Sequence, residues 1–420
     1  MTSTLNSPFP VWAIAAVSAL GVITRPFRLP EAVWAVLGAL LLCLLGRLPW
    51  LDALHAVGKG TDVYLFLVGM MLASELARKE GLFDYMAVLA ARRADGSATR
   101  LFFLLYCVGT VVTVLMSNDA TAVVLTPAVL AVVRTVNARK PLPYLYICAF
   151  VANAASFVLP ISNPANLVIF GENMPSLGQW LSRFLLPSAL SIVLTYLILR
   201  VLLRESLVQS LDKQPQVPRL SAAGKATGWG IVLMAAVMLA ASALGVSLGW
   251  PTFVAGIAVF LGVCIQKRHL QWDYLAEISW SVLPLVAGLF VLVEGLARTG
   301  VIAWLAHVLG TVSAQSAQHA GLLSGLFVAL ASNLINNLPA GLIAGNTVAA
   351  AHAPAHVLNA VLVGIDLGPN LSVTGSLATI LWLAALRREG VEVKALAFLK
   401  LGAAVMLPTL LVALVSTGFF

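Results

Sequence analysis

Charged residues are scarce in this sequence. Only 10% of its 420 residues are Asp, Glu, Lys or Arg, against about a quarter in a typical soluble domain, and 60% are hydrophobic. The mean hydropathy is +0.96. A chain so poor in charge cannot cover an apolar core with a polar surface, which excludes a soluble globular protein. We therefore expect an all-α polytopic membrane protein, because helices satisfy their own backbone hydrogen bonds in lipid.

Nucleotide and metal signatures are also absent. The sequence contains no GxxxxGK[ST] phosphate loop, no HExxH zinc motif and no GxGxxG dinucleotide motif. No polar segment is long enough for a nucleotide-binding domain. We therefore expect a protein that is not an enzyme, binds no cofactor, and draws its energy from a gradient or from a partner protein.

Cysteine is rare as well. The four cysteines lie far apart in apolar runs without CxxC spacing, which favours small buried hydrophobic residues over a metal or redox site. They are Cys43, Cys107, Cys148 and Cys264.

Long hydrophobic runs make up the rest of the chain. Crossing a bilayer core of about 30 Å takes roughly 20 apolar residues in a helix. We predict ten crossings, five in each half: 10–24, 30–46, 61–76, 144–171 and 181–203, then 229–246, 250–264, 278–296, 355–386 and 395–418. Between the third and fourth of each half lies a shorter double run with a polar centre, 101–133 and 322–351. These double runs are predicted to be re-entrant hairpins whose tips stop at mid-membrane.

Two of the ten stretches are too long for one crossing and contain helix breakers. The stretch 144–171 is interrupted at 160–164, which reads PISNP, and the stretch 355–386 at 366–370, which reads DLGPN. Proline removes a backbone donor and clashes with the preceding turn. Each stretch is therefore predicted to form two half-helices joined by unwound backbone, which a membrane tolerates only where it is buried or lines a cavity.

The two halves of the sequence resemble each other. Residues 76–87 (LARKEGLFDYMA) match residues 296–306 (LARTGVIAWLA) with one residue deleted, and each copy precedes a polar-tipped double run. Five crossings per half is an odd number, so the second half must be inverted relative to the first. We predict a first transmembrane repeat over 1–204, a cytoplasmic linker over 205–228 and a second repeat over 229–420, with the broken helices at the repeat interface.

Positive charges are distributed asymmetrically between the predicted loops. With both termini outside, all but four of the 25 lysines and arginines fall on the inside; the exceptions are Arg47, Lys59, Arg183 and Arg298. The positive-inside rule therefore predicts a multi-pass protein of the cell (inner) membrane with both termini outside. It also accounts for the net charge of +8 without a nucleic-acid partner. The N-terminal residues lack the basic start of a secretory signal, so we expect the first span to be retained.

Carboxylates inside the predicted spans are the sharpest functional signal, since a charge at the bilayer centre is costly and usually handles a proton or an ion. Asp119 lies at the first hairpin tip and Asp366 at a helix break, and we assign both to ion or proton coupling. For Asp119 the alternative is a cap for the second hairpin helix. Glu75 and Glu294 lie three and four residues before an arginine, which favours helical ion pairs over a functional role.

Neutral amides and hydroxyls are concentrated at the same interruptions. Together they suit a small uncharged polyhydroxyl solute, or an alkali cation held by carbonyl oxygens. They do not suit a dicarboxylate, because no arginine lies near the tips. For any single asparagine the alternative is a hydrogen bond that only holds helices together. The candidate substrate-binding residues are Asn118, Asn153, Ser162, Asn163, Asn166, Asn333, Asn336, Asn337, Gly368, Asn370, Ser372 and Thr374.

At these residues the chain resembles the ion transporter superfamily, and within it the arsenite efflux pumps of the ArsB type. The matching motifs are 117–119 (SND) followed by 124–127 (VLTP), 162–163 (SN) with Asn166, 336–339 (NNLP), and 364–369 (GIDLGP) running on to 375–383 (GSLATILWL). The resemblance covers essentially the whole chain. At Asn370 the chain departs from the family pattern, because at least some relatives carry a basic residue there.

The resemblance implies secondary active efflux of trivalent arsenite, and of antimonite, from the cytoplasm in exchange for protons by alternating access. It also implies, in some members, a soluble ATPase bound on the cytoplasmic side. The residues agree with this, because arsenite at neutral pH is mostly an uncharged trihydroxide that an asparagine- and serine-lined site can bind. A cluster of three thiols would hold it too tightly to release.

Other functions fit the sequence less well. A sodium/proton antiporter of the same superfamily usually pairs an acidic residue with asparagine in both hairpin tips, whereas the second tip here, Asn336–Asn337, is neutral. A transporter of another anion or neutral solute is a further alternative. An intramembrane enzyme would need a nucleophile or a metal set, and the sequence shows neither.

Overall fold

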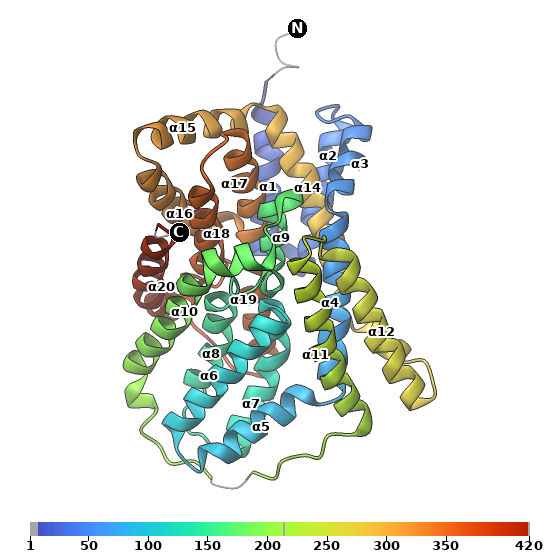
Figure 1. Cartoon of the computed structure of the whole chain (residues 1–420), viewed down its shortest axis with the longest axis vertical. Coiled ribbons are helices and arrows are strands. Elements are labelled where there is room, and N and C mark those ends of the chain that lie inside the picture. The colour runs from blue at the N-terminus through green and yellow to red at the C-terminus, as the bar shows by residue number, and fades with distance from the viewer. Residues whose placement is uncertain (1–6, 213–214, 419–420) are drawn as a thin grey trace.

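The computed structural model describes residues 7–212 and 215–418, which are almost entirely helical (Figure 1). In the first half the helices are α1 Phe9–Thr24, α2 Glu31–Leu44, α3 Trp50–Lys59, α4 Thr61–Lys79, α5 Leu82–Ala94, α6 Ala98–Leu115, α7 Thr126–Thr135, α8 Leu142–Ala154, α9 Pro164–Phe170 and α10 Leu177–Leu202. In the second half they are α11 Ala222–Ala243, α12 Gly249–Lys267, α13 Trp272–Ala276, α14 Val282–Arg298, α15 Val301–Gln315, α16 Ala317–Ile335, α17 Asn337–Ala350, α18 Ala355–Leu367, α19 Leu377–Arg388 and α20 Ala395–Thr417. These ranges contain no β-strand, and the all-α prediction is confirmed.

Six of the described helices are long and apolar enough to cross a membrane on their own: α6, α10, α11, α12, α16 and α20. Two bent pairs, α3–α4 at 49° and α14–α15 at 72°, raise the number to eight. Helices α1, α2 and α8 are apolar but shorter. Helices α6 and α16 are longer than expected. Each was predicted to be the short first arm of a re-entrant hairpin. The total of ten crossings stays a prediction.

Both predicted helix breaks are present, and they have the same spacing. Helices α8 and α18 are each 13 residues long. Each is followed by a nine-residue interval, 155–163 or 368–376, before the second half-helix, α9 or α19, begins. The prolines and asparagines of these intervals therefore mark the unwound backbone correctly.

Helix contacts in one half have counterparts in the other. Helix α4 packs on α12 as α2 packs on α14, α6 packs on α8 as α16 packs on α18, and α10 packs on α20. The amphipathic helices α5 and α15 lie at opposite ends of the molecule in Figure 1, α5 at the lower end with the chain that joins α10 to α11. These contacts support two related halves, whose inverted relation stays a prediction.

The chain between the halves is shorter than expected. Helix α11 begins at Ala222, inside the predicted linker 205–228, because the Ser221 side chain caps it by accepting a hydrogen bond from the Gly224 amide at 2.8 Å. Both chain termini, near Ser3 and Phe420, are expected outside the cell. These residues are not among those that the structure describes.

Small residues bring the long helices into backbone contact. A Cβ atom on Gly69 of α4 would lie 2.3 Å from the carbonyl oxygen of Thr252 on α12, and one on Gly256 would lie 2.8 Å from the Cα of Gly69. On the other side of the molecule, a Cβ on Gly288 of α14 would lie 2.7 Å from the backbone of Ala35 on α2. In lipid, where apolar burial gives helices little reason to associate, close van der Waals packing of this kind stabilises the bundle.

This packing predicts the effect of a single substitution on α12. Gly256→Leu places a side chain against the α4 backbone, and overpacking of this kind costs about 1–3 kcal/mol. We expect a lower melting temperature in detergent, measured by the fluorescence of the purified protein. The matched control is Gly262→Leu on the same helix, because nothing lies within 4 Å of a Cβ at that position. Equal melting temperatures for the two variants would contradict the packing argument.

Candidate functional site

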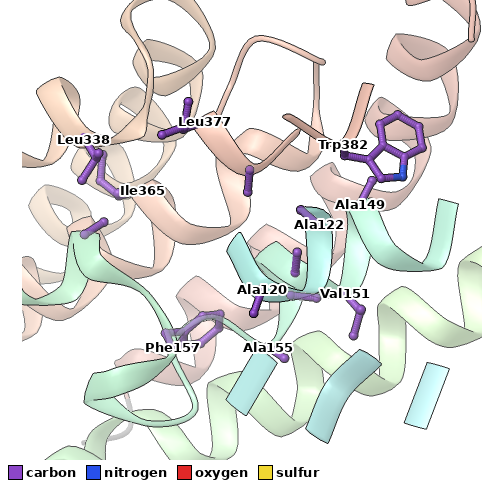
Figure 2. Close-up of a cluster of buried hydrophobic side chains, with 14 of the residues drawn as sticks. Ala120, Ala122, Ala149, Val151, Ala155, Phe157, Leu338, Ile365, Leu377 and Trp382 are labelled. Atoms are coloured by element: carbon purple, nitrogen blue, oxygen red, sulfur yellow. The ribbon is translucent and has the colours of Figure 1, made fainter. Parts of the chain in front are cut away.

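The two hairpins and the two broken helices meet in the middle of the molecule. Figure 2 shows buried apolar side chains from all four: Ala120 and Ala122 after the first tip, Val151 and Phe157 around the first break, Leu338 beside Ile365, and Leu377 with Trp382 on α19. Most candidate substrate-binding residues are buried here, while Asn333, Ser372 and Thr374 are half-buried. The two hairpins and the two helix breaks, which carry the polar interruptions of the sequence, therefore lie together.

Asn166 holds the first break together. Its side-chain amide donates to the carbonyl oxygens of Ser156 at 3.0 Å, Pro160 at 3.3 Å and Leu159 at 3.4 Å. The Ser162 hydroxyl donates to the Val114 carbonyl at 2.9 Å, which ties the break to the first hairpin. Asn166 thus satisfies carbonyl groups of the unwound break that would otherwise lack a partner. Ser162 satisfies a carbonyl in the last turn of α6.

Asn333, on the second hairpin, does the same for the second break. Its amide donates to the carbonyl of Gly368 at 2.9 Å, and its own Oδ1 accepts from the Ser372 hydroxyl at 2.7 Å. The Thr374 hydroxyl donates to the Asn333 carbonyl at 3.0 Å. Gly368 is needed because a Cβ there would lie 2.5 Å from the backbone of Ala329. Each break is therefore held by an asparagine and by its neighbouring hairpin.

Hydrogen bonds also link each break to the other half of the chain. The Asn153 amide at the end of α8 donates to Asn370 Oδ1 at 3.0 Å, and the Asn370 amide donates to the Phe150 carbonyl at 3.2 Å. In the other direction, the Asn163 amide donates to Asp366 Oδ1 at 2.6 Å. These side chains join the two halves at the centre, and Asn370 needs no charge to do so.

Each half-helix that begins at the centre has its N-terminus capped by a neutral side chain. Asn163 Oδ1 accepts from the Ala165 amide of α9 at 3.0 Å, and Asn336 Oδ1 accepts from the Leu338 amide of α17 at 3.4 Å. Ser376, which the sequence analysis missed although a serine before an apolar helix is a start signal, accepts from the Thr379 amide of α19 at 3.1 Å. Asn337 adds a backbone bond, its amide donating to the Gly375 carbonyl at 3.0 Å.

At the first hairpin tip the cap is Ser117. Its hydroxyl accepts from the Ala120 amide at 3.3 Å, whereas the Asp119 side chain makes no capping bond. Interpreting Asp119 as a cap is therefore wrong. A π-helical turn, η2 (Ala120–Leu125), follows directly and leads into α7. Such turns occur frequently at functional sites.

A cavity of ≈ 570 Å³ opens beside this centre, between α4, α14, α19 and the first hairpin. Its deep end is lined by Ser117, Asp119, Pro164 and Leu377. Charged residues line its mouth: Glu75, Arg78, Glu277, Arg388 and Glu389. Asp119 is the candidate site residue that lines this cavity; the candidate amides lie behind its wall.

Ion pairs organise the mouth of the cavity. Arg78 Nε donates to Glu75 Oε2 at 3.0 Å, and Arg78 and Lys79 both pair with Glu277, which follows α13. Hydrogen bonds from Lys79 and Arg78 hold the pKa of Glu277 below its usual value. The ion-pair interpretation of Glu75 is confirmed. So is that of Glu294, which pairs with Arg298 at 3.7 Å and also with Lys59 at 2.9 Å.

Three buried oxygens at the centre have no hydrogen-bond partner among the described atoms: Asn118 Oδ1, Asn166 Oδ1 and Asp366 Oδ2. A buried acceptor without a partner is costly, which makes these atoms candidates for accepting a proton or a ligand donor. Asp366 is fully buried, with 0% of its surface exposed. The cysteines, by contrast, are dispersed over α2, α6, α8 and α12, and none lines the cavity.

Several curated relatives are similar to this chain along most of its length. The arsenical pump membrane protein of Escherichia coli (strain K12) is 26% identical over 360 residues, which cover 83% of each chain. A second arsenical pump membrane protein from Escherichia coli is 25% identical over 417 residues, or 96% of each chain. An uncharacterized transporter of Mycobacterium tuberculosis (strain ATCC 25618 / H37Rv) is 27% identical over 373 residues, or 84% of each chain. The resemblance to arsenical pumps is thus confirmed.

A solved structure shares the fold. The Alcanivorax borkumensis YdaH transporter superposes with a TM-score of 0.58 at 18% identity, and the match covers 90% of this chain and 88% of the transporter. At that identity the likeness shows the fold alone. The family model named CitMHS, citrate transporter, matches residues 19–366. Because that match spans most of the sequence, this chain belongs to the citrate transporter (CitMHS) family of membrane transporters.

Proposed function

We propose that this transporter exports trivalent arsenite from the cytoplasm in exchange for protons, by alternating access. The arsenical pumps among its relatives support this substrate. The observation that carries the proposal is the neutrality of the centre, where the half-helix N-termini are already capped by serine and asparagine side chains. The same chemistry extends to antimonite, and a soluble ATPase on the cytoplasmic side stays a prediction.

Citrate, the solute in the family's name, fits this centre poorly. A tricarboxylate needs cationic side chains or free helix N-termini to replace its water. The cations lining the described cavity, Arg78 and Arg388, lie at its mouth, and Arg78 is already paired with Glu75 and Glu277. An uncharged trihydroxide needs neutral donors and acceptors. The Ser117 hydroxyl lines the cavity, and the Oδ1 of the neighbouring Asn118 has no partner among the described atoms.

Two carboxylates are placed to couple transport to protons. Asp119 is half-buried and lines the cavity, so water reaches it from the mouth. Asp366 is fully buried against the first break. A carboxylate in the membrane that lacks a cationic partner is most stable when protonated, and it can release that proton when its surroundings change.

The side on which the cavity opens supports loading from the cytoplasm. Arg78 lies in the last turn of α4, directly before α5, at the end of the molecule that carries the chain between the halves (Figure 1). By the distribution of lysine and arginine, this end faces the cytoplasm. An inward-facing cavity with Asp119 at its deep end supports loading of arsenite from the cytoplasm.

Proton coupling predicts the behaviour of two variants. The assay uses everted membrane vesicles whose interior is acidified by a proton pump. Asp119→Asn and Asp366→Asn should each abolish arsenite accumulation in these vesicles, because an amide cannot exchange protons. The matched control is Glu294→Gln, whose carboxylate only takes part in the ion pairs with Lys59 and Arg298.

Two outcomes would count against this assignment. If both aspartate variants accumulate arsenite as the parent does, the coupling group lies elsewhere, with Glu75 next to be tested. If parent vesicles accumulate labelled citrate but not arsenite, the substrate is wrong. If parent vesicles exchange sodium for protons but do not accumulate arsenite, the sodium/proton antiporter is favoured instead.

Thiols are predicted to be dispensable for transport. Trivalent arsenic binds sulfur strongly, but each added 1.4 kcal/mol of affinity slows release about tenfold at a fixed on-rate. A variant with all four cysteines changed to serine or alanine should therefore still confer arsenite resistance on growing cells, at matched protein levels. A single Cys→Ser change that removes resistance in a normally folded protein would show that a thiol is a ligand.

A further inference from the structure

Asn153 and Asp366 occupy equivalent positions in the two halves. Each is the penultimate residue of a 13-residue helix, α8 or α18, and each precedes a nine-residue break, 155–163 or 368–376. Each side chain also hydrogen-bonds to the break of the opposite half, Asn153 with Asn370 and Asp366 with Asn163. The two residues therefore make equivalent contacts across the interface between the halves.

The two links differ in one chemical respect. The Asn153 amide donates to Asn370 Oδ1, and the Asn370 amide donates to the Phe150 carbonyl. This link is therefore made entirely of neutral groups. Asp366 accepts from Asn163 through Oδ1, while its buried Oδ2 has no partner among the described atoms. An amide cannot titrate, whereas a carboxyl group at the equivalent position can.

The groups that contact Asp366 leave room for a proton. Asn163 and Ser156 face it, and both are neutral. A lone carboxylate buried among neutral groups is costly, while the carboxylic acid is neutral and matches the neutral link at Asn153. Binding one proton from the outside converts the carboxylate into the acid, and releasing that proton to the cytoplasm restores it.

We propose that the interface between the halves carries a single exchangeable proton, which is held at Asp366. We also propose that an aspartate placed at the equivalent position, 153, can carry this proton in place of Asp366. This rests on the proposed function and deepens it by fixing the number of protons carried at this interface. Since arsenite is uncharged, each proton that enters moves one positive charge, so the charge moved per cycle counts the proton held at Asp366 together with any proton carried at Asp119.

The test uses the full-length protein purified into liposomes, with arsenite as solute and an imposed proton gradient. Asp366→Asn should reduce proton-driven uptake to the level of empty liposomes. Adding Asn153→Asp should restore uptake clearly above the Asp366→Asn level. The matched control adds Asn359→Asp instead, since Asn359 is also a buried asparagine on α18 but is not linked to the opposite break. No recovery in the double variant, or equal recovery in the control, would overturn the proposal.

A second measurement keeps the proposal testable if the double variant misfolds. Asn153→Asp alone retains Asp366 and should raise the charge moved per cycle by one. The potential that balances a tenfold arsenite gradient is about 59 mV divided by the number of charges moved per cycle, so it should be lower in this variant than in the parent. An unchanged balancing potential in a normally folded variant would overturn the inference. If the parent moves no arsenite at all, the proposed substrate fails, and the same variants are then compared by proton flux with the solute that the parent does carry.

Discussion

The structure depends on one constraint, that unwound backbone inside a membrane must find its hydrogen-bond partners within the protein. The chain unwinds twice near its centre, over 155–163 and 368–376, and so frees carbonyl groups that no water in lipid could reach. Asn166 satisfies those of the first break and Asn333 contacts the second from the neighbouring hairpin. Ser162 bonds to Val114 on the first hairpin, as Asn333 of the second hairpin bonds to Gly368, so each hairpin lies beside a helix break.

The same constraint limits which groups remain for a solute. Asn166, Ser162 and Asn333 are occupied with backbone, and Asn163 both caps α9 and holds Asp366. Most of the amides that composition marks as substrate ligands thus build the site rather than line the cavity. What faces the cavity at its deep end is a serine, a carboxylate and small apolar groups. A transporter scaffold can therefore change solute class by changing a few cavity-lining residues, because the backbone is secured by others.

Sequence reasoning succeeded where the signal is local and failed where it is not. Proline and asparagine marked both breaks, because their effect on the backbone is exerted within a turn. Sequence reasoning could not pair Asn153 with Asn370, because these residues are 217 positions apart and no local pattern near either residue indicates its partner. The cap at the first tip was given to Asp119 as an alternative, although Ser117 makes it, because serine and aspartate are equally good caps and only geometry separates them. The apolar run that begins near Trp229 likewise placed the start of α11 too late, because the helix starts at a polar capping serine that lies before that run.

The two sides of the centre are packed differently, which bears on the proposed alternating access. On one side α17 lies directly on α9: a Cβ on Gly345 would be 2.7 Å from the carbonyl oxygen of Ile169. The Ile169 side chain also packs on α17, since a Cβ on Gly341 would lie 3.1 Å from it. On the other side is the cavity between α4, α19 and the first hairpin. Under the proposed alternating access, the contact between α17 and α9 must open while the cavity closes, and both changes can take place with the hydrogen bonds that hold each break kept intact.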